Sequence, residues 1–170
     1  TCCGDFKIHT FTGPGTFTVT NAGSASGSNT VSYMVIAGGG AGGKMRGGGA
    51  GAGGFRESKA ASDSYTASPL NATSGPGYNL PVSEQAYPIT VGGGAAAADG
   101  SSSPPDVGAP LGGTSTFSTI SSTGGGKGAG SAGEGSAVAG GSGGGSMDGA
   151  SGGAGNTPPT SPPQGNTGGV

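Results

Sequence analysis

The fold of this chain follows from the stretch YMVIAGGGAGG at residues 33–43, in which an apolar run passes directly into glycine. The apolar part predicts a β-strand over residues 31–37. Because both of its faces are apolar, we expect the strand to be packed between two layers. Glycine offers no side chain to a core and loses the most backbone entropy on ordering. Residues 38–43 must therefore either stay disordered or pack backbone against backbone.

The succession of a strand and a glycine block recurs twice further along the chain. Residues 87–91 lead into the glycines at 92–94, and residues 114–120 lead into the glycine-rich block at 124–130. A disordered low-complexity chain would not keep placing strands at the entrances of its glycine blocks. The regularity therefore favours ordered glycine.

The composition supports order and excludes several functions. Glycine accounts for 44 of the 170 residues, but only 8% of residues are charged and the formal net charge is −2. Disordered chains that are poor in apolar residues usually carry a high net charge. The 6 Lys and Arg residues cannot form a basic track for nucleic acid. No apolar run approaches the roughly 20 residues of a membrane-spanning helix, so we expect no membrane insertion.

Ordered glycine can adopt the polyproline-II conformation, which has about three residues per turn and no internal hydrogen bonds. Such helices satisfy their backbone groups when they lie side by side and exchange N–H···O=C bonds. We therefore predict a mainly β fold with irregular structure and almost no α-helix, in which N-terminal strands precede packed polyglycine-II helices. The expected regions are strands and a hairpin at 1–37, a glycine-rich domain with short strands and loops at 38–126, and a low-complexity Gly/Ser/Pro-rich tail at 127–170.

Turn and loop signals fill in the remaining regions. Alternating residues at 6–11 and 16–20 flank Gly13-Pro14-Gly15, which predicts a β-hairpin. Polar stretches without a period predict long loops at 58–80 and 95–110, and a shorter loop at 156–164.

The sequence contains no convincing catalytic or cofactor-binding motif. Gly38, Gly40 and Gly43 satisfy GxGxxG after a strand, with Glu57 near the position of a ribose-binding acid. That motif needs a helix to follow, and residues 44–54 are too rich in glycine to form one. The acidic residues are scattered along the chain. We therefore expect no enzyme, no catalytic residue and no cofactor.

Histidine and cysteine give little sign of a metal site. His9 is the only histidine and has no acidic or cysteine partner at ligand spacing. It is expected to be solvated or to lie between subunits, with a metal site in a symmetric trimer as the alternative. Cys2 and Cys3 are adjacent, so they are either a pair of reduced thiols or form a bridge between subunits. Because the chain starts at Thr1, we expect it to be a segment of a longer protein.

Five blocks of sequence, in order, resemble a glycine-rich domain that is frequent in the tail fibres of bacteriophages, especially marine ones. The blocks are KIHTFTGPGTFTV at 7–19, YMVIAGGGAGG at 33–43, GGAGAGGFR at 48–56, VSEQAYPITVGGG at 82–94, and STFSTI at 115–120 with the glycines at 124–126. The chain after Lys127 matches this domain only in composition.

The resemblance implies a non-enzymatic component of the virion tail, assembled in the host cytoplasm. Related adhesins hold variable loops at the end of packed polyglycine helices, and those loops touch the host surface. The implied partners are other virion tail proteins and a host surface glycan or outer-membrane protein, with the chain acting as a homotrimer or on a trimeric fibre. The candidate receptor-binding residues lie in the two long loops: Tyr65, Asn71, Tyr78, Asp99 and Asp106. Tyr65 and Tyr78 would either stack on sugar rings or cap the glycine helices.

Two other functions stay open at this point. One is a purely structural virion or extracellular filament without a receptor. The other is ice binding through a flat Thr/Ala face, although the strict glycine triplets and stapling disulfides expected for that function are missing.

Overall fold

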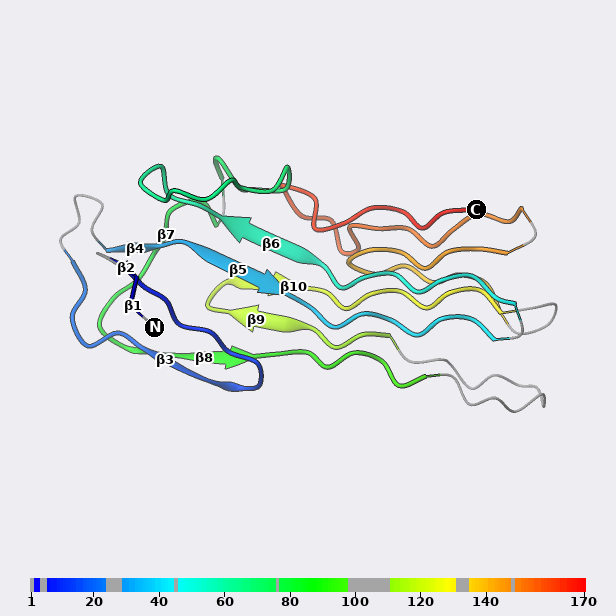
Figure 1. Ribbon diagram of the computed structural model, residues 1–170, viewed down its shortest axis with the longest axis horizontal. Helices are drawn as coiled ribbons and strands as arrows, with labels where there is room; N and C mark the ends of the chain where they lie inside the picture. The colour runs from blue at the N-terminus through cyan, green and yellow to red at the C-terminus, as the bar shows by residue number, and fades with distance from the viewer. Residues whose placement is uncertain are drawn as a thin grey trace.

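The computed structural model describes residues 2–3, 6–23, 29–44, 46–75, 77–97, 111–130, 135–147 and 149–170. These residues contain β-strands and irregular segments but no helix, which confirms the predicted mainly β class. The strands gather at one end of an elongated molecule, and glycine-rich segments run from them to the other end (Figure 1). We call these the strand end and the glycine end.

The strands form small antiparallel sheets. The largest has the order β10-β9-β8-β3, and the pairs β1-β2, β4-β7 and β5-β6 complete the set for the described residues. The strands are β1 (Cys2–Cys3), β2 (Phe6–Lys7), β3 (Gly15–Thr18), β4 (Thr30–Val31), β5 (Tyr33–Ile36), β6 (Phe55–Ser58), β7 (Leu80–Pro81), β8 (Ala86–Thr90), β9 (Ser115–Phe117) and β10 (Ile120–Ser122). Strands thus stand at the entrances of three glycine blocks, as predicted. The single strand expected at 114–120 is wrong, because the chain turns at Ser118, which has φ 52°, and β10 pairs back onto β9 with Ile120 opposite Phe117.

A small aromatic core joins these sheets. The Phe117 ring lies 5.8 Å from Phe17, 6.0 Å from Tyr87 and 6.4 Å from Tyr33, in each case edge-on. This is the arrangement that aromatic quadrupoles favour. The buried cluster consists of Tyr33, Val35, Leu80, Val82, Tyr87, Phe117 and Ile120.

The predicted N-terminal hairpin is wrong. β2 pairs with β1, and β3 pairs with β8, where Phe17 lies opposite Tyr87. This pairing brings Phe17 against Phe117 and so into the aromatic core. The chain does bend at residues 12–14 and brings His9 against Phe17, so the turn signal is confirmed, but β3 takes β8 rather than residues 6–11 as its strand partner.

The strand predicted at residues 31–37 is broken and is not packed between two layers. Ser32 separates β4 from β5, and its hydroxyl donates to the Asp63 carboxylate at 2.6 Å. Tyr33 and Val35 are buried, but Met34 is 55% exposed and Ile36 is 53% exposed. The described residues supply one apolar layer for β5 to pack on, so its second face stays in solvent.

Backbone hydrogen bonds outside the strands recur at every third residue. Ala37, Gly40 and Gly43 donate to the carbonyls of Gly54, Gly51 and Gly48 at 3.0, 3.0 and 2.9 Å. In a β-strand the side-chain period is about two, and partners lie only on two sides. A period of three instead points successive backbone groups in three directions.

Residues 123–130 show the three directions directly. The amides of Gly125 and Gly128 donate to the segment 37–43, and those of Gly126 and Ala129 donate to the segment 138–146. The carbonyls of Thr123, Gly126 and Ala129 accept from a third neighbour, the segment 47–54. The Gly112 amide also donates to the Gly125 carbonyl at 3.1 Å, so one extended segment is held by four others.

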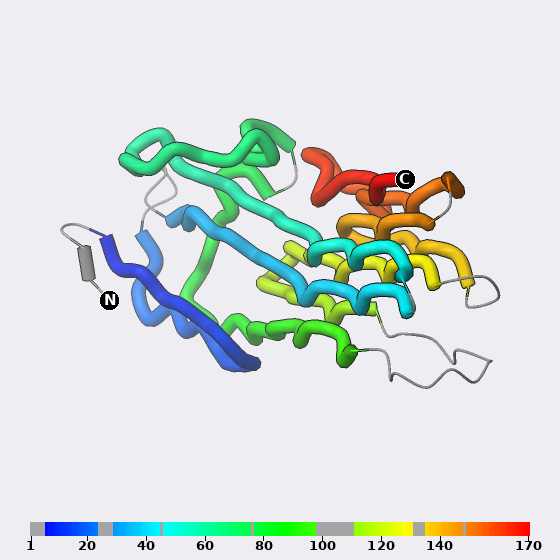
Figure 2. The backbone as a smooth tube through the Cα atoms, turned by 45° about the vertical axis from the view of Figure 1, so that its right-hand side comes forward, coloured from blue at the N-terminus to red at the C-terminus, as the bar shows by residue number. Residues whose placement is uncertain are grey.

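These hydrogen bonds arrange the glycine segments in two rows. The first row holds 92–95, 37–43, 47–54 and 164–169, and the second holds 111–113, 123–130, 138–146 and 150–157. The segments run side by side along the long axis (Figure 2). Residues 138–147 and 149–170, from the low-complexity tail, bond to the earlier segments and so belong to the same array.

The rows approach so closely that only glycine fits between them. A Cβ atom added at Gly43 would overlap the carbonyl oxygen of Ala129, and one added at Gly125 would overlap that of Gly51. Segments within the second row are equally close, since a Cβ at Gly143 would overlap the carbonyl oxygen of Gly153. The neighbouring atoms are backbone and cannot swing away, as a side chain could.

Candidate functional site

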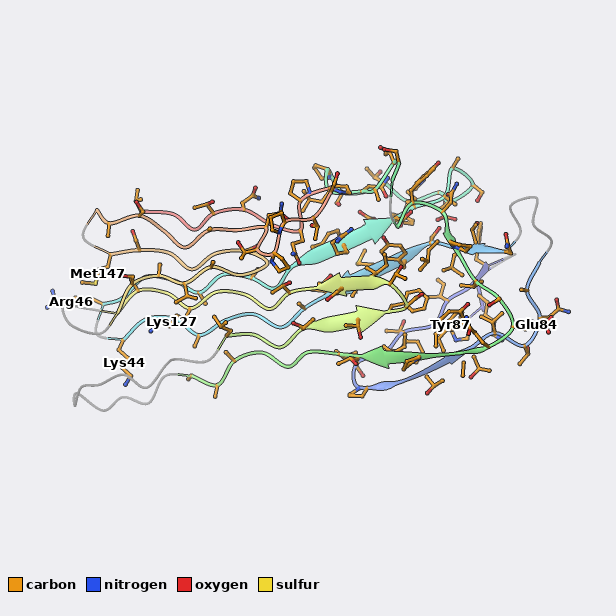
Figure 3. All side chains as sticks on the ribbon, turned by 180° about the vertical axis from the view of Figure 1, so that it is seen from behind. Lys44, Arg46, Glu84, Tyr87, Lys127 and Met147 are labelled. Atoms are coloured by element: carbon orange, nitrogen blue, oxygen red, sulfur yellow. The ribbon has the colours of Figure 1, made fainter. Side chains whose placement is uncertain are left out.

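The surface loops of the described residues gather at the two ends of the molecule. Lys44, Arg46 and Met147 lie at the glycine end, where segments turn back, and Glu84 lies at the strand end (Figure 3). The N-terminus also lies at the strand end (Figure 1). The sequence analysis singled out no residue of the turn that contains Lys44 and Arg46, because a short cationic turn between glycine blocks resembles any solvated loop.

The first predicted loop, residues 58–80, is anchored on Glu57 of β6. This carboxylate is only 2% exposed. Its Oε2 accepts a hydrogen bond from the Ser68 amide at 2.9 Å, and the Tyr65 hydroxyl donates to it as well. The Glu57 carbonyl accepts from the Ala72 amide at 2.9 Å. No pattern in residues 55–58 predicts that this carboxylate is buried.

Tyr65 lies where a receptor-binding residue could act, on the surface of this loop. Its side chain is 43% exposed. Burial, followed by the charge and hydrogen bond of Glu57 and the charge of Asp63, raises the pKa of Tyr65 to about 12. The Lys59 ammonium lies 5.4 Å from the ring centre. The ring is therefore held in place by its hydroxyl and by a cation on its face.

Asn71 acts as an anchor of the loop. Its Oδ1 accepts from the Lys59 amide at 2.9 Å, and its backbone forms a parallel bridge with Glu57. Tyr78 lies in a different turn and is 38% exposed, between Gly77 at φ 93° and Asn79 at φ 49°. Asp99 and Asp106 lie outside the described residues. Tyr78 thus lies in a different turn from Tyr65 and does not share its contact with Glu57. Asn71 has a structural role in the loop of Tyr65.

Gln164 is a buried polar residue that the sequence analysis missed. It is 1% exposed. Its Oε1 accepts from the Thr123 amide at 2.8 Å, its Nε2 donates to the Pro158 carbonyl at 2.9 Å, and its own carbonyl accepts from the Phe55 amide at 2.8 Å. The residue therefore ties the 156–164 loop to both rows. A glutamine in a Pro-rich tail carries no signal of such a position.

The described residues contain neither a cluster of metal-binding side chains nor a membrane-spanning helix. No group of three or more His, Cys, Asp or Glu side chains there could hold a metal ion, and no helix there is long and apolar enough to cross a bilayer. His9 is exposed, and its ring lies edge-on to Phe17 at 5.1 Å. The side chains of Cys2 and Cys3 lie outside the described part.

Comparison with known proteins identifies the family. The sequence profile of the family described as "Glycine-rich domain" matches residues 11–170, and the chain belongs to this family. No curated protein and no solved structure matches the chain significantly.

Proposed function

We propose that this member of the glycine-rich domain family is a non-enzymatic component of a phage tail fibre or tail tip that displays loops for attachment to the host surface. The observation that carries the proposal is the two-row array of backbone hydrogen bonds. It runs from the strand end, where the chain begins, to turns at the opposite end. A rod of this kind can hold loops away from a particle without needing a large apolar core.

The conformation we propose for the glycine segments is polyglycine-II. The supporting observations are the three-residue spacing of donors, the four neighbouring segments of residues 123–130, and the absence of strands from these segments. Backbone torsions measured by nuclear magnetic resonance should lie near φ of about −75° and ψ of about +145°. Values near about −140° and +135° across these segments would replace the proposal with a β-sheet.

The proposed ligand is a host surface glycan or an outer-membrane protein. Tyr65 supports a glycan ligand, because it offers a partly exposed aromatic ring held in a fixed position. Such rings combine an apolar face with a polar edge. In this proposal the chain binds other tail proteins, as one chain on a trimeric fibre or as three copies, through surface other than the Tyr65 loop, and Tyr78, Asp99 and Asp106 stay candidates alongside Tyr65.

The test is binding of the purified, fluorescently labelled chain to a panel of intact bacteria, measured by flow cytometry. We expect binding to a subset of strains. Tyr65→Ala should weaken that binding at least about tenfold if the ring contributes about 1.4 kcal/mol to affinity. The matched control is Phe6→Ala, another half-exposed ring at the strand end. No binding to any strain that the parent phage infects would contradict the receptor role.

A purely structural filament is the second candidate. It is favoured by the many backbone hydrogen bonds that join neighbouring segments along the length of the molecule. Such an array is stable without a bound ligand. In that case fibres should form from the isolated chain, and their diffraction would report the packing. Reflections near about 4.7 Å and 10 Å would indicate cross-β stacking, in place of the three-residue arrangement.

A further inference from the structure

The first row of glycine segments has an outer face that the described residues leave uncovered. In the segment 37–43, the amides of Gly40 and Gly43 point to the neighbouring segment 47–54, and the carbonyls of Gly38 and Ala41 accept from the second row. The Gly39 carbonyl accepts from the Ala95 amide at 2.8 Å, within the same row. With a period of three, the Cβ directions left to face outward are those of Ile36, Gly39 and Gly42. Their exposure agrees, since Ile36 is 53% exposed, Gly39 is partly exposed and Gly42 is exposed.

Nothing inside the molecule requires glycine at these outward positions. A Cβ at Gly39 or Gly42 would meet its nearest neighbour at 3.8 or 3.9 Å, which is ordinary van der Waals contact. A Cβ at Gly49, in the adjacent segment, would meet nothing within 4 Å. Their φ angles are not in the left-handed region. Glycine costs conformational entropy wherever it is ordered, so glycine at these positions indicates a close approach from outside.

We propose that this outer face, formed by Met34, Ile36, Gly39, Gly42 and Gly49, packs against the same face of a second copy of this chain. The two rows within one molecule already show which surface a glycine face accepts: another glycine face of the same sequence. The outer face also carries Met34 at 55% exposure, an apolar side chain that gains from being covered. A face that pairs with itself gives a closed two-fold dimer.

The two copies lie antiparallel. Met34 and Ile36 make one end of the face bulky, whereas Gly39 and Gly42 make the other end flat. In a parallel pair the bulky ends would meet and hold the glycines apart, while in an antiparallel pair each bulky end lies over a flat one. The antiparallel choice rests on this shape alone, because the loop beside β5 at the strand end carries both Asp63 and Lys59, so charge does not favour either direction. This inference does not depend on the receptor role, but it excludes the three-copy assembly of the proposed function and is compatible only with attachment of the chain to a separate trimeric fibre.

The experiment is sedimentation equilibrium of the full chain over a range of concentrations. We expect a dimer. Gly42→Leu should raise the dimer dissociation constant at least about a hundredfold, because the side chain blocks the close approach yet meets open space within its own chain. Ala154→Leu adds the same side chain at an exposed position of the second row and should leave association unchanged.

Met34→Ser tests the same face without bulk and should weaken the dimer at least about tenfold, with no change in the melting temperature of the monomer. A wild-type chain that is monomeric throughout would overturn the proposal. So would a trimer, or a dimer that neither Gly42→Leu nor Met34→Ser weakens. If Gly42→Leu lowers the melting temperature, the outcome rests on Met34→Ser.

Discussion

The two ends of this molecule are held together in different ways. At the strand end, side chains do the packing, and Phe117 alone has aromatic contacts with Phe17, Tyr33 and Tyr87. At the glycine end, backbone groups bond to one another in three directions, and Cβ atoms are excluded. The comparison shows that a chain poor in large apolar residues can still be ordered, provided that hydrogen bonds between backbone amides and carbonyls take the place of side-chain packing. Four predictions test that difference, from the largest expected effect to the smallest.

Removing the central ring should damage the strand end most. Phe117→Ala deletes an 8% exposed aromatic side chain, and we expect it to lower the free energy of unfolding by about 3–5 kcal/mol. Urea denaturation measures this change. The half-exposed Phe6 provides the control, since Phe6→Ala should cost far less.

Hydrogen exchange in Phe117→Ala would sharpen the comparison further. If the two ends are held independently, amides of the core strands should lose protection while Gly126 and Gly144 keep theirs. Equal loss of protection at both ends would show that the rows of glycine segments depend on the aromatic core.

Adding one methyl group should damage the glycine end. A Cβ at Gly125 would overlap backbone atoms of Gly51, so Gly125→Ala forces the rows apart and should cost about 3 kcal/mol. The measurement is the same urea titration. Gly93→Ala is the matched control because its Cβ meets nothing within 4 Å, and it should be neutral or slightly stabilising. Equal effects at the two positions would mean that backbone contact does not hold this end together.

Gln164 connects the C-terminal residues 150–170 to the rest of the array through its hydrogen bonds. Gln164→Ala removes two side-chain hydrogen bonds and leaves the Thr123 amide without its acceptor, which should cost about 2 kcal/mol. The melting temperature and protease resistance of residues 150–170 should both fall. Asn166→Ala, at an exposed side chain in the same segment, should change neither. An unchanged melting temperature in Gln164→Ala would show that the tail is held by its backbone alone.

The smallest effect concerns the loop on Glu57. The pKa of Tyr65 is raised to about 12, so its neutral form is favoured in the folded chain. The stabilisation of the loop is therefore fully present below pH of about 10, the pKa of an unfolded tyrosine, and is lost as the pH rises through about 12.

Phenolate absorbance gives the measurement. Tyr65→Phe should remove a transition near pH 12. If the transition near pH 12 persists in Tyr65→Phe, another tyrosine is responsible, and Tyr33 is the candidate because burial raises its pKa.

Local patterns in the sequence predicted the elements better than their partners. The strands before the glycine blocks were found because an apolar run against glycine is a strong contrast. The hairpin at Gly13-Pro14-Gly15 failed because strand pairing was decided by Phe17 and its distant aromatic partners. Among the candidate residues, Tyr65 lies exposed on a held loop, whereas Asn71 serves that loop as an anchor. Glu57 and Gln164 were missed, because burial of a polar side chain depends on groups that are far away in sequence.

By itself, the sequence determined the mainly β class, the lack of helix in the described residues and the need for backbone-to-backbone packing, because glycine content and strand periodicity are local properties. Only the tertiary structure decided which segments became neighbours, which glycines must stay glycine and which face of β5 stays in solvent. Hydrogen-bond partners in three directions come from segments tens of residues apart. Because the glycine blocks have nearly the same sequence, local sequence cannot show which block pairs with which.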